Sequence, residues 1–94
     1  MNGGGYRIFE TRQFEEDLKV LVKSGESRIV DRLQELIYPE LRETPYFGRN
    51  MKKLKGYSPE TWRCRIGSWR FFFEIDEEEK TVFMIAASHR GSAY

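Results

Sequence analysis

Cationic side chains recur in the second half of the chain at spacings that suit the binding of an anion. They comprise Arg63 and Arg65, then Arg70, and later the pair His89-Arg90 followed by Tyr94. If the first two lie on the strand face opposite the predicted helices, their guanidinium groups meet Arg70 and the His89-Arg90 segment across neighbouring strands. Crowding cations on an uncovered sheet face is costly unless an anion completes the site. A phosphodiester of RNA is one such anion.

The charge of the chain is unevenly distributed. The whole chain has a net charge of +1, but residues 47–75 carry seven bases against two acids, a local net charge of +5. The part before this segment carries seven bases against nine acids, and the part after it begins with four consecutive acids. The basic segment also holds Tyr57, Trp62 and Trp69, so it combines attraction for phosphate with rings on which bases stack. The alternative is a solvated sheet face whose arginines pair with acids such as Glu74.

Several classes of enzyme lack the residues that they need. One cysteine and one histidine in the chain exclude an internal disulfide, a cysteine-based zinc cluster and a His-rich metal centre. No Walker loop, H-E-x-x-H or G-x-S-x-G motif is present, so nucleotide hydrolysis, metal hydrolysis and serine esterase chemistry lack support. Cys64 alternates with Trp62 and Ile66, and we interpret it as a buried small hydrophobic residue rather than a cysteine nucleophile.

The length and composition predict one domain over residues 1–94. The chain is 39% hydrophobic and 33% charged, which is enough apolar material for one compact core. Residues 1–5 are predicted to be a flexible lead-in without the basic and apolar regions of a secretory signal. No apolar run approaches the roughly 20 residues that span a bilayer. With its single cysteine, the expected setting is the reducing cytoplasm.

The first half of the chain predicts a short strand and a helix hairpin. Residues 6–10 suit a strand, and Thr11 is a suitable N-cap for a helix whose first turns carry acids. The apolar stripe of that helix follows the helical repeat at Phe14, Leu18, Leu21 and Val22. A break at residues 24–25 precedes a second helix predicted from about Glu26 to Tyr38, because Pro39 disfavours helical geometry at the residue before it. Residues 40–50 are predicted to form a loop.

The second half predicts strands, because the apolar period changes from helical to two at Met51. The predicted strands span residues 51–55, 62–66, 69–75 and 81–87, with turn residues between them. Within the second of these strands, Arg63 and Arg65 share one face while apolar side chains take the other. The element order β-α-α-β-β-β predicts an α+β fold, in which a two-helix hairpin packs on one face of a mainly antiparallel sheet.

Four segments of the chain together resemble the toxins of the RelE/ParE superfamily. They are residues 53–56 (KLKG), 62–70 (WRCRIGSWR), 73–76 (FEID) and 89–94 (HRGSAY). Members of this superfamily commonly carry such motifs in this order after two helices, and they are the toxins of bacterial and archaeal type II toxin–antitoxin modules. The resemblance covers the chain from about Tyr6, and it implies the RelE/ParE-like fold.

The RelE branch of this superfamily cuts mRNA on the ribosome, so the resemblance implies an endoribonuclease that needs no metal or other cofactor. The ribose 2′-hydroxyl attacks the adjacent phosphorus, which gives a 2′,3′-cyclic phosphate and a 5′-hydroxyl. This reaction needs an acceptor for the 2′ proton, a proton donor for the leaving 5′ oxygen and cations for the charge of the transition state.

The motif match also implies a role for each arginine. Arg70 holds the scissile phosphate, and Arg90 acts as the acid or as a further clamp. Arg63 and Arg65 stabilise charge and position the RNA backbone. Some relatives carry lysine at the positions of Arg63 and Arg65. Arginine is the better bidentate clamp for phosphate and the poorer proton carrier.

The proton acceptor and two further RNA contacts come from the ends of the matched region. The resemblance implies that Tyr94 stacks on a base and accepts the 2′ proton. His89 competes for that role, because imidazoles titrate near neutral pH whereas phenols titrate at about pH 10. Lys53 and Lys55 of the KLKG segment are predicted to bind RNA.

Two alternatives to the endonuclease remain open. ParE-like members of the superfamily inhibit DNA gyrase without catalysis, and a third type of relative is non-toxic and only binds an antitoxin. All three imply a small antitoxin partner whose C-terminal segment wraps the toxin and places acids over the arginines. The toxin–antitoxin complex then binds operator DNA through the antitoxin, and the endonuclease adds the ribosome and mRNA as partners.

Overall fold

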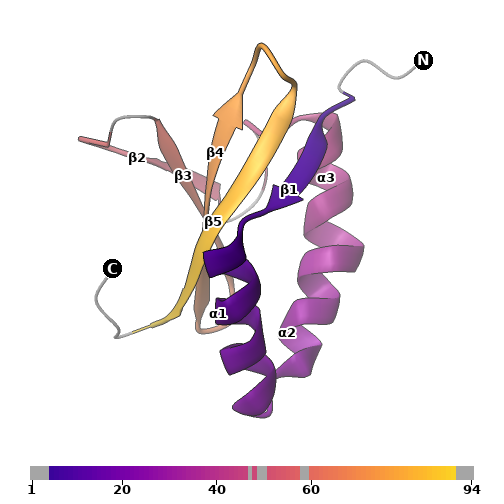
Figure 1. The fold of residues 1–94 in the computed structure, drawn as a ribbon, viewed down its shortest axis with the longest axis vertical. Helices are drawn as coiled ribbons and strands as arrows, with labels where there is room; N and C mark the ends of the chain where they lie inside the picture. The colour runs from indigo at the N-terminus through magenta and orange to yellow at the C-terminus, as the bar shows by residue number, and fades with distance from the viewer. Residues whose placement is uncertain (1–4, 47, 49–50, 58–59, 91–94) are drawn as a thin grey trace.

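A layer of helices covers one face of a five-stranded sheet (Figure 1). The computed structural model describes residues 5–46, 48, 51–57 and 60–90. Its elements in chain order are β1 (Arg7–Glu10), α1 (Arg12–Lys23), α2 (Ser27–Arg32), the π-helix η1 (Leu33–Ile37), α3 (Tyr38–Glu43), β2 (Met51–Leu54), β3 (Thr61–Ile66), β4 (Trp69–Asp76) and β5 (Thr81–His89). The predicted α+β class, with helices gathered between a first strand and a run of later strands, is confirmed, but four strands (β2 to β5) follow the helices where the predicted order β-α-α-β-β-β counts three. No helix in these described ranges is long and apolar enough to cross a bilayer.

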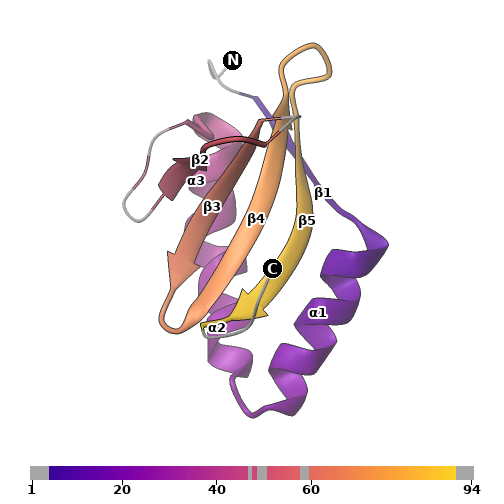
Figure 2. The same cartoon turned by 90° about the vertical axis from the view of Figure 1, so that its left-hand side faces the viewer.

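The sheet has the strand order β1-β5-β4-β3-β2. β1 runs parallel to β5, and the other neighbouring pairs are antiparallel, which confirms the prediction of a mainly antiparallel sheet. Seen from the side shown in Figure 2, strands β3 to β5 lie in front of the helices. We call this side, which none of the described helices covers, the open face.

The core lies between the helices and the other face of the sheet. Fully buried side chains from the helices, among them Phe14, Leu21, Leu33 and Leu41, pack against others from β3, β4 and β5, among them Cys64, Phe71, Phe73, Val82 and Met84. Because strand side chains alternate between faces, each of these buried residues of β3 and β4 is followed by a residue whose side chain lies on the open face. The apolar strand residues therefore determine which polar residues lie on the open face.

Helix α1 is joined to β5 by two polar side chains. Thr11 is the N-cap, as predicted, and its hydroxyl accepts a hydrogen bond from the Phe14 amide at 3.2 Å while donating to the Met84 carbonyl at 2.9 Å. Further along the helix, the Asp17 carboxylate accepts a hydrogen bond from the Ala87 amide at 2.9 Å. This contact satisfies an amide of β5 beyond the point where its pairing with β1 ends.

The prediction that the second helix ends before Pro39 is wrong. The helical path continues from α2 through η1 into α3, and Pro39 occupies the first turn of α3. At the end of η1 the Tyr38 amide donates to the Leu33 carbonyl, five residues back, so the hydrogen-bond ladder changes register just before Pro39. A proline has no amide hydrogen to donate, and it is tolerated where a turn of the helix begins afresh. The predicted loop consequently begins at Thr44 rather than at residue 40.

A β-bulge in β5 changes which side chains reach the open face. Phe73 pairs with Met84 but Phe72 pairs with Ala86, so Ile85 is an extra residue on β5. Beyond this point Ser88 lies on the open face opposite Arg70. An uninterrupted alternation from Met84 would instead put Ser88 on the helix side.

Candidate functional site

Arginines from β3 and β4 meet on the open face of the sheet. Arg65 is directly opposite Arg70 in the register of these strands, and Arg63 is directly opposite Phe72. Directly opposed residues of an antiparallel pair project from the same face. The prediction that Arg63 and Arg65 share a face, away from the buried Cys64 and Ile66, is therefore confirmed.

A third arginine joins this pair at the turn between β3 and β4. Arg65, Arg70 and Arg90 line one pocket of about 240 Å³, together with Gly67 and Ser68 of the turn. The Arg90 amide donates to the Ser68 carbonyl at 2.6 Å, which holds the residue after β5 against the turn. Gly67 has a φ of 59°, a left-handed conformation at the first turn position that favours glycine. We call this cavity the arginine pocket.

The guanidinium groups of the arginine pocket have no carboxylate partner among the described residues. The ion pairs in that part of the chain are Lys53–Glu60 and Lys80–Glu77, and neither involves an arginine. Glu74, the acid proposed as a cross-strand partner, lies opposite Thr61 and Phe83 instead. Like charges placed directly opposite each other destabilise a sheet. The pocket is therefore a site at which an anion relieves a repulsion built into the strand register.

His89, which also has a predicted catalytic role, does not join this pocket. His89 lies opposite Trp69 on the side of the sheet that faces the helices, with ring centroids 5.4 Å apart in an edge-on arrangement. His89 and Arg70 therefore lie on opposite faces of the sheet. Tyr94 lies outside the described residues.

Cys64 is fully buried, as the sequence predicts. Burial, reinforced by the nearby charge of Glu40, raises the pKa of its thiol to about 12. A thiol in this environment is protonated at neutral pH and out of reach of a substrate, so the alternative of a cysteine nucleophile has no support in the structure.

Comparisons with known proteins place this arrangement in a family. The model of the ParE toxin of type II toxin–antitoxin systems, parDE, matches residues 8–94. The chain belongs to this toxin family. It thereby belongs to the RelE/ParE superfamily predicted from the four motifs.

Solved structures of toxins share the fold of this ParE-family chain. The toxin–antitoxin complex RelBE2 of Mycobacterium tuberculosis contains a chain with 27% identity and a TM-score of 0.71, with 94% of each chain covered. The YoeB/ParE toxin from Agrobacterium tumefaciens has 20% identity and a TM-score of 0.73 over 89% of this chain and 98% of that one. An E. coli RelE mutant bound to an antitoxin RelBc peptide has 20% identity and a TM-score of 0.72 over 95% and 86%. No curated protein sequence matches significantly.

Lys52 and Lys53 of this ParE-family toxin lie on opposite faces of β2. Lys53, a predicted RNA ligand, lies opposite Trp62 and forms an ion pair with Glu60 at 2.7 Å. Lys55 is exposed in the turn that follows β2. Lys52, for which the sequence predicted no role, lies opposite Arg63 on the open face. Only the strand register identifies it, and an alternating pattern in a strand of four residues does not fix that register.

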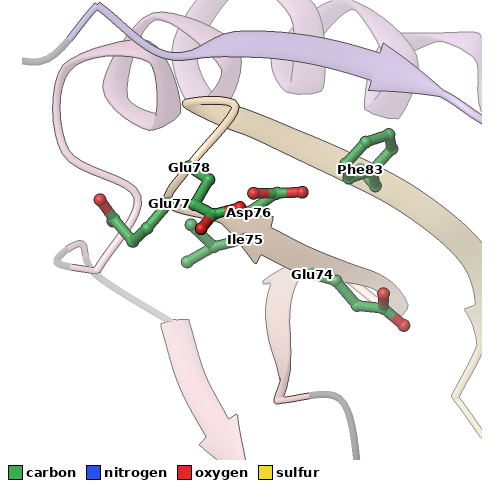
Figure 3. A pocket seen from close by; sticks show the side chains of 6 residues that line it. All are labelled: Glu74, Ile75, Asp76, Glu77, Glu78 and Phe83. Carbon is green, nitrogen blue, oxygen red and sulfur yellow. The ribbon is translucent and has the colours of Figure 1, made fainter.

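The opposite end of the open face of the toxin is acidic. A pocket of about 420 Å³ there is lined by Phe83 and by residues 74–78, of which four are acids (Figure 3). Glu77 accepts hydrogen bonds from Tyr46, from Tyr6 at 2.5 Å and from Lys80 at 2.9 Å. These bonds, with that of Tyr46 contributing most, lower the pKa of the Glu77 carboxyl to about 2. The open face is thus cationic at the β3–β4 turn and anionic at the β4–β5 loop, so an approaching polyanion is directed to the arginine pocket.

Proposed function

We propose that this toxin cleaves mRNA on the ribosome by a reaction that needs no metal ion. The observation that carries the proposal is the direct opposition of Arg65 and Arg70, with Arg90 in the same pocket and no carboxylate of the described residues paired with any of them. Three guanidinium groups without a described carboxylate partner suit a phosphoryl group whose oxygens gain negative charge during the reaction. The likeness of the fold to E. coli RelE adds support.

In the proposed reaction, the 2′ oxygen of a ribose forms a bond to the adjacent phosphorus while the bond from phosphorus to the 5′ oxygen breaks. The 2′-hydroxyl loses a proton to a base and the leaving oxygen gains one, so the products are a 2′,3′-cyclic phosphate and a 5′-hydroxyl. Arg70 and Arg65 hold the phosphate oxygens from adjacent strands, and Arg90 closes the pocket beside the turn. Among the residues that the structure describes, no histidine or carboxylate lines this pocket, and Tyr94 remains the acceptor that the family resemblance predicts.

A second candidate function is inhibition of DNA gyrase without catalysis. The observation that favours it is the family model itself, which describes the ParE toxin. A gyrase-binding protein needs no cluster of cations around a reacting phosphate, and this is why we rank the endonuclease first. The two functions leave different products in the cell, namely cut mRNA or broken DNA.

We further propose that the toxin is neutralised by a small antitoxin with an acidic segment. Solved neighbours from Mycobacterium tuberculosis, Pyrococcus horikoshii and Methanococcus jannaschii are toxin–antitoxin complexes. The three arginines of the arginine pocket, which have no carboxylate partner among the described residues, provide a complement for acids in such a partner.

The test is induction of the toxin in growing cells, followed by primer extension on a translated mRNA. Wild-type toxin is compared with Arg70→Ala and Arg90→Ala, and with Arg28→Ala as a control at an exposed arginine on helix α2. The proposal expects cuts in phase with codons for the wild type and for Arg28→Ala, and their loss in the two pocket variants. Intact mRNA together with accumulated gyrase–DNA breaks would instead establish the second candidate. Normal growth with a folded protein would exclude both activities.

A further inference from the structure

A second pair of like charges lies beside the arginine pocket on the open face. Lys52 of β2 is directly opposite Arg63 of β3, and neither forms an ion pair within the described part of the chain. Arg63 precedes Arg65 by two residues, so this pair lies about 6.6 to 6.8 Å along the strand from the pocket. Cations from three neighbouring strands thus form two adjacent rows, one of Lys52 and Arg63 and the other of Arg65 and Arg70.

The neighbouring Lys53 shows what an ordinary strand lysine does in this fold. Its side chain is on the other face of β2, and its ammonium group is 2.7 Å from the Glu60 carboxylate. Lys52 is equally exposed, has the same charge and lies in the same strand, yet it faces a guanidinium group instead of an acid. The charge of Lys53 is therefore compensated by an acid, whereas Lys52 has no acidic partner among the described residues, because the two side chains lie on opposite faces of β2.

Arg63 is also incompletely satisfied. Its Nε atom is buried and has no hydrogen-bond partner, and the residue opposite it on β4 is the apolar Phe72. A buried donor without an acceptor is costly, and the cost is larger for a charged group. The arrangement is tolerable when an anion neutralises the guanidinium group from the solvent side.

We propose that Lys52 and Arg63 bind the phosphodiester next to the reacting one on the same RNA strand. This inference rests on the proposed function, because the arginine pocket is taken to hold the reacting phosphate. The two cationic rows lie two residues apart along the strands, and this regular separation matches a chain that carries one negative charge per nucleotide. An extended peptide matches both rows only where it carries acids two residues apart, whereas every nucleotide of an RNA strand carries a phosphate, and this favours a nucleic acid strand over a peptide.

The experiment measures binding of a five-nucleotide RNA that carries 2′-deoxyribose throughout its centre, so that it cannot be cleaved. Fluorescence anisotropy is recorded at several salt concentrations for the wild type, Lys52→Ala, Lys52→Arg and Lys53→Ala. A nucleoside 5′-monophosphate serves as the ligand with a single phosphate, and a hexaglutamate peptide serves as the acidic peptide. All three substitutions are at exposed positions of one strand, so they probe charge rather than folding.

We expect Lys52→Ala to weaken binding of the oligonucleotide about three- to tenfold and to lower the slope of log affinity against log salt by about 0.7. Lys52→Arg and Lys53→Ala bind as the wild type does, and the affinity for the monophosphate is unchanged in every variant. Equal losses in Lys52→Ala and Lys53→Ala overturn the inference, as does an equal loss of hexaglutamate binding or an oligonucleotide that the wild type does not bind. Because the readout is binding, oligonucleotide affinity that depends on Lys52 in a toxin that leaves mRNA uncut would refute the cleavage and retain the second phosphate position.

Discussion

Two polar clusters at opposite ends of β4 are built in opposite ways. At the β4–β5 loop, one carboxylate, that of Glu77, receives hydrogen bonds from Tyr6, Tyr46 and Lys80. At the β3–β4 turn, three arginines share a pocket, and none of them has a carboxylate partner among the described residues. The first cluster joins the loop to the start of β1 and to the segment after α3, so it has a structural task and contains every partner that this task requires. The second cluster has no such described partners, and the proposed phosphate ligand would supply the missing negative charge.

This difference indicates how to separate stabilising from functional charges in a small domain. A structural cluster contributes to folding because its charges compensate one another, whereas a binding site retains uncompensated charge at some cost to stability. Substitutions in the two clusters should therefore act on different observables. Loss of a Glu77 contact should lower stability and leave activity unchanged. Loss of a pocket arginine should lower activity and raise stability.

The largest expected effect is that of Arg70→Ala on the proposed cleavage. Removal of one group that stabilises transition-state charge typically lowers the rate about 10²- to 10³-fold. The rate of codon-phased cleavage by purified toxin on programmed ribosomes measures this effect, with Arg70→Lys expected to retain part of the activity because it keeps the charge but not the bidentate geometry. A variant within threefold of the wild type would remove Arg70 from the reaction.

The second effect tests the other cluster. Glu77→Gln removes the charge that organises two tyrosines and a lysine, so the Tm measured by circular dichroism should fall by about 3 °C. Glu78→Gln is the matched control, since Glu78 lies on the same loop and has no ion pair with a described residue. Both variants should cleave at the wild-type rate. An unchanged Tm in Glu77→Gln would mean that the hydrogen-bonded cluster does not stabilise the fold.

The same cluster predicts a dependence of stability on pH. The pKa of Glu77 is lowered to about 2 in the folded chain, below the ordinary value for a glutamate. A lowered folded-state pKa contributes stability that is present above about pH 4.5 and is lost as the pH falls towards 2. The Tm of the wild type should therefore fall more steeply than that of Glu77→Gln across this interval. Parallel curves for the two proteins would contradict the assignment.

A smaller effect with the opposite sign is expected in the arginine pocket. Arg65→Gln removes one of two like charges that oppose each other directly, so the free energy of unfolding should rise by about 0.5 kcal/mol while cleavage falls. Urea unfolding of the variant and the wild type at low salt measures this, and added salt should narrow the difference by screening the repulsion. A loss of stability in Arg65→Gln would show that the pocket is not under electrostatic strain.

The sequence predicted the parts of this fold that depend on local periodicity. The alternation of Trp62, Cys64 and Ile66 with two arginines assigned the faces of β3 correctly, because both faces of a strand follow from a single buried residue. The periodicity did not predict the passage of the helix through Pro39, which depends on the wide π-helical turn that precedes this proline. Nor did it select Lys52 over Lys53, because that choice depends on the register between β2 and β3.

The position of His89 was equally hidden, since it depends on the bulge at Ile85. Without the extra residue, Phe83, Ile85, Ala87 and His89 would all lie on the open face, and the imidazole would be close to Arg70. With it, His89 packs edge-on against Trp69 on the helix side. A single inserted residue in a strand reverses the face of every side chain beyond it, and the sequence contains no local signal for that residue.

The smallest expected effect therefore concerns His89. Because the sheet lies between this imidazole and the arginine pocket, His89→Ala should change the rate of cleavage less than threefold and leave its pH profile unchanged. His89→Gln, which keeps a polar side chain against Trp69, controls for any loss of packing at the end of β5. A loss of cleavage in both variants, with loss of the limb of the pH profile near neutrality, would mean that the bulge is absent when RNA is bound. In that case the comparison between the two faces would apply only to the free toxin.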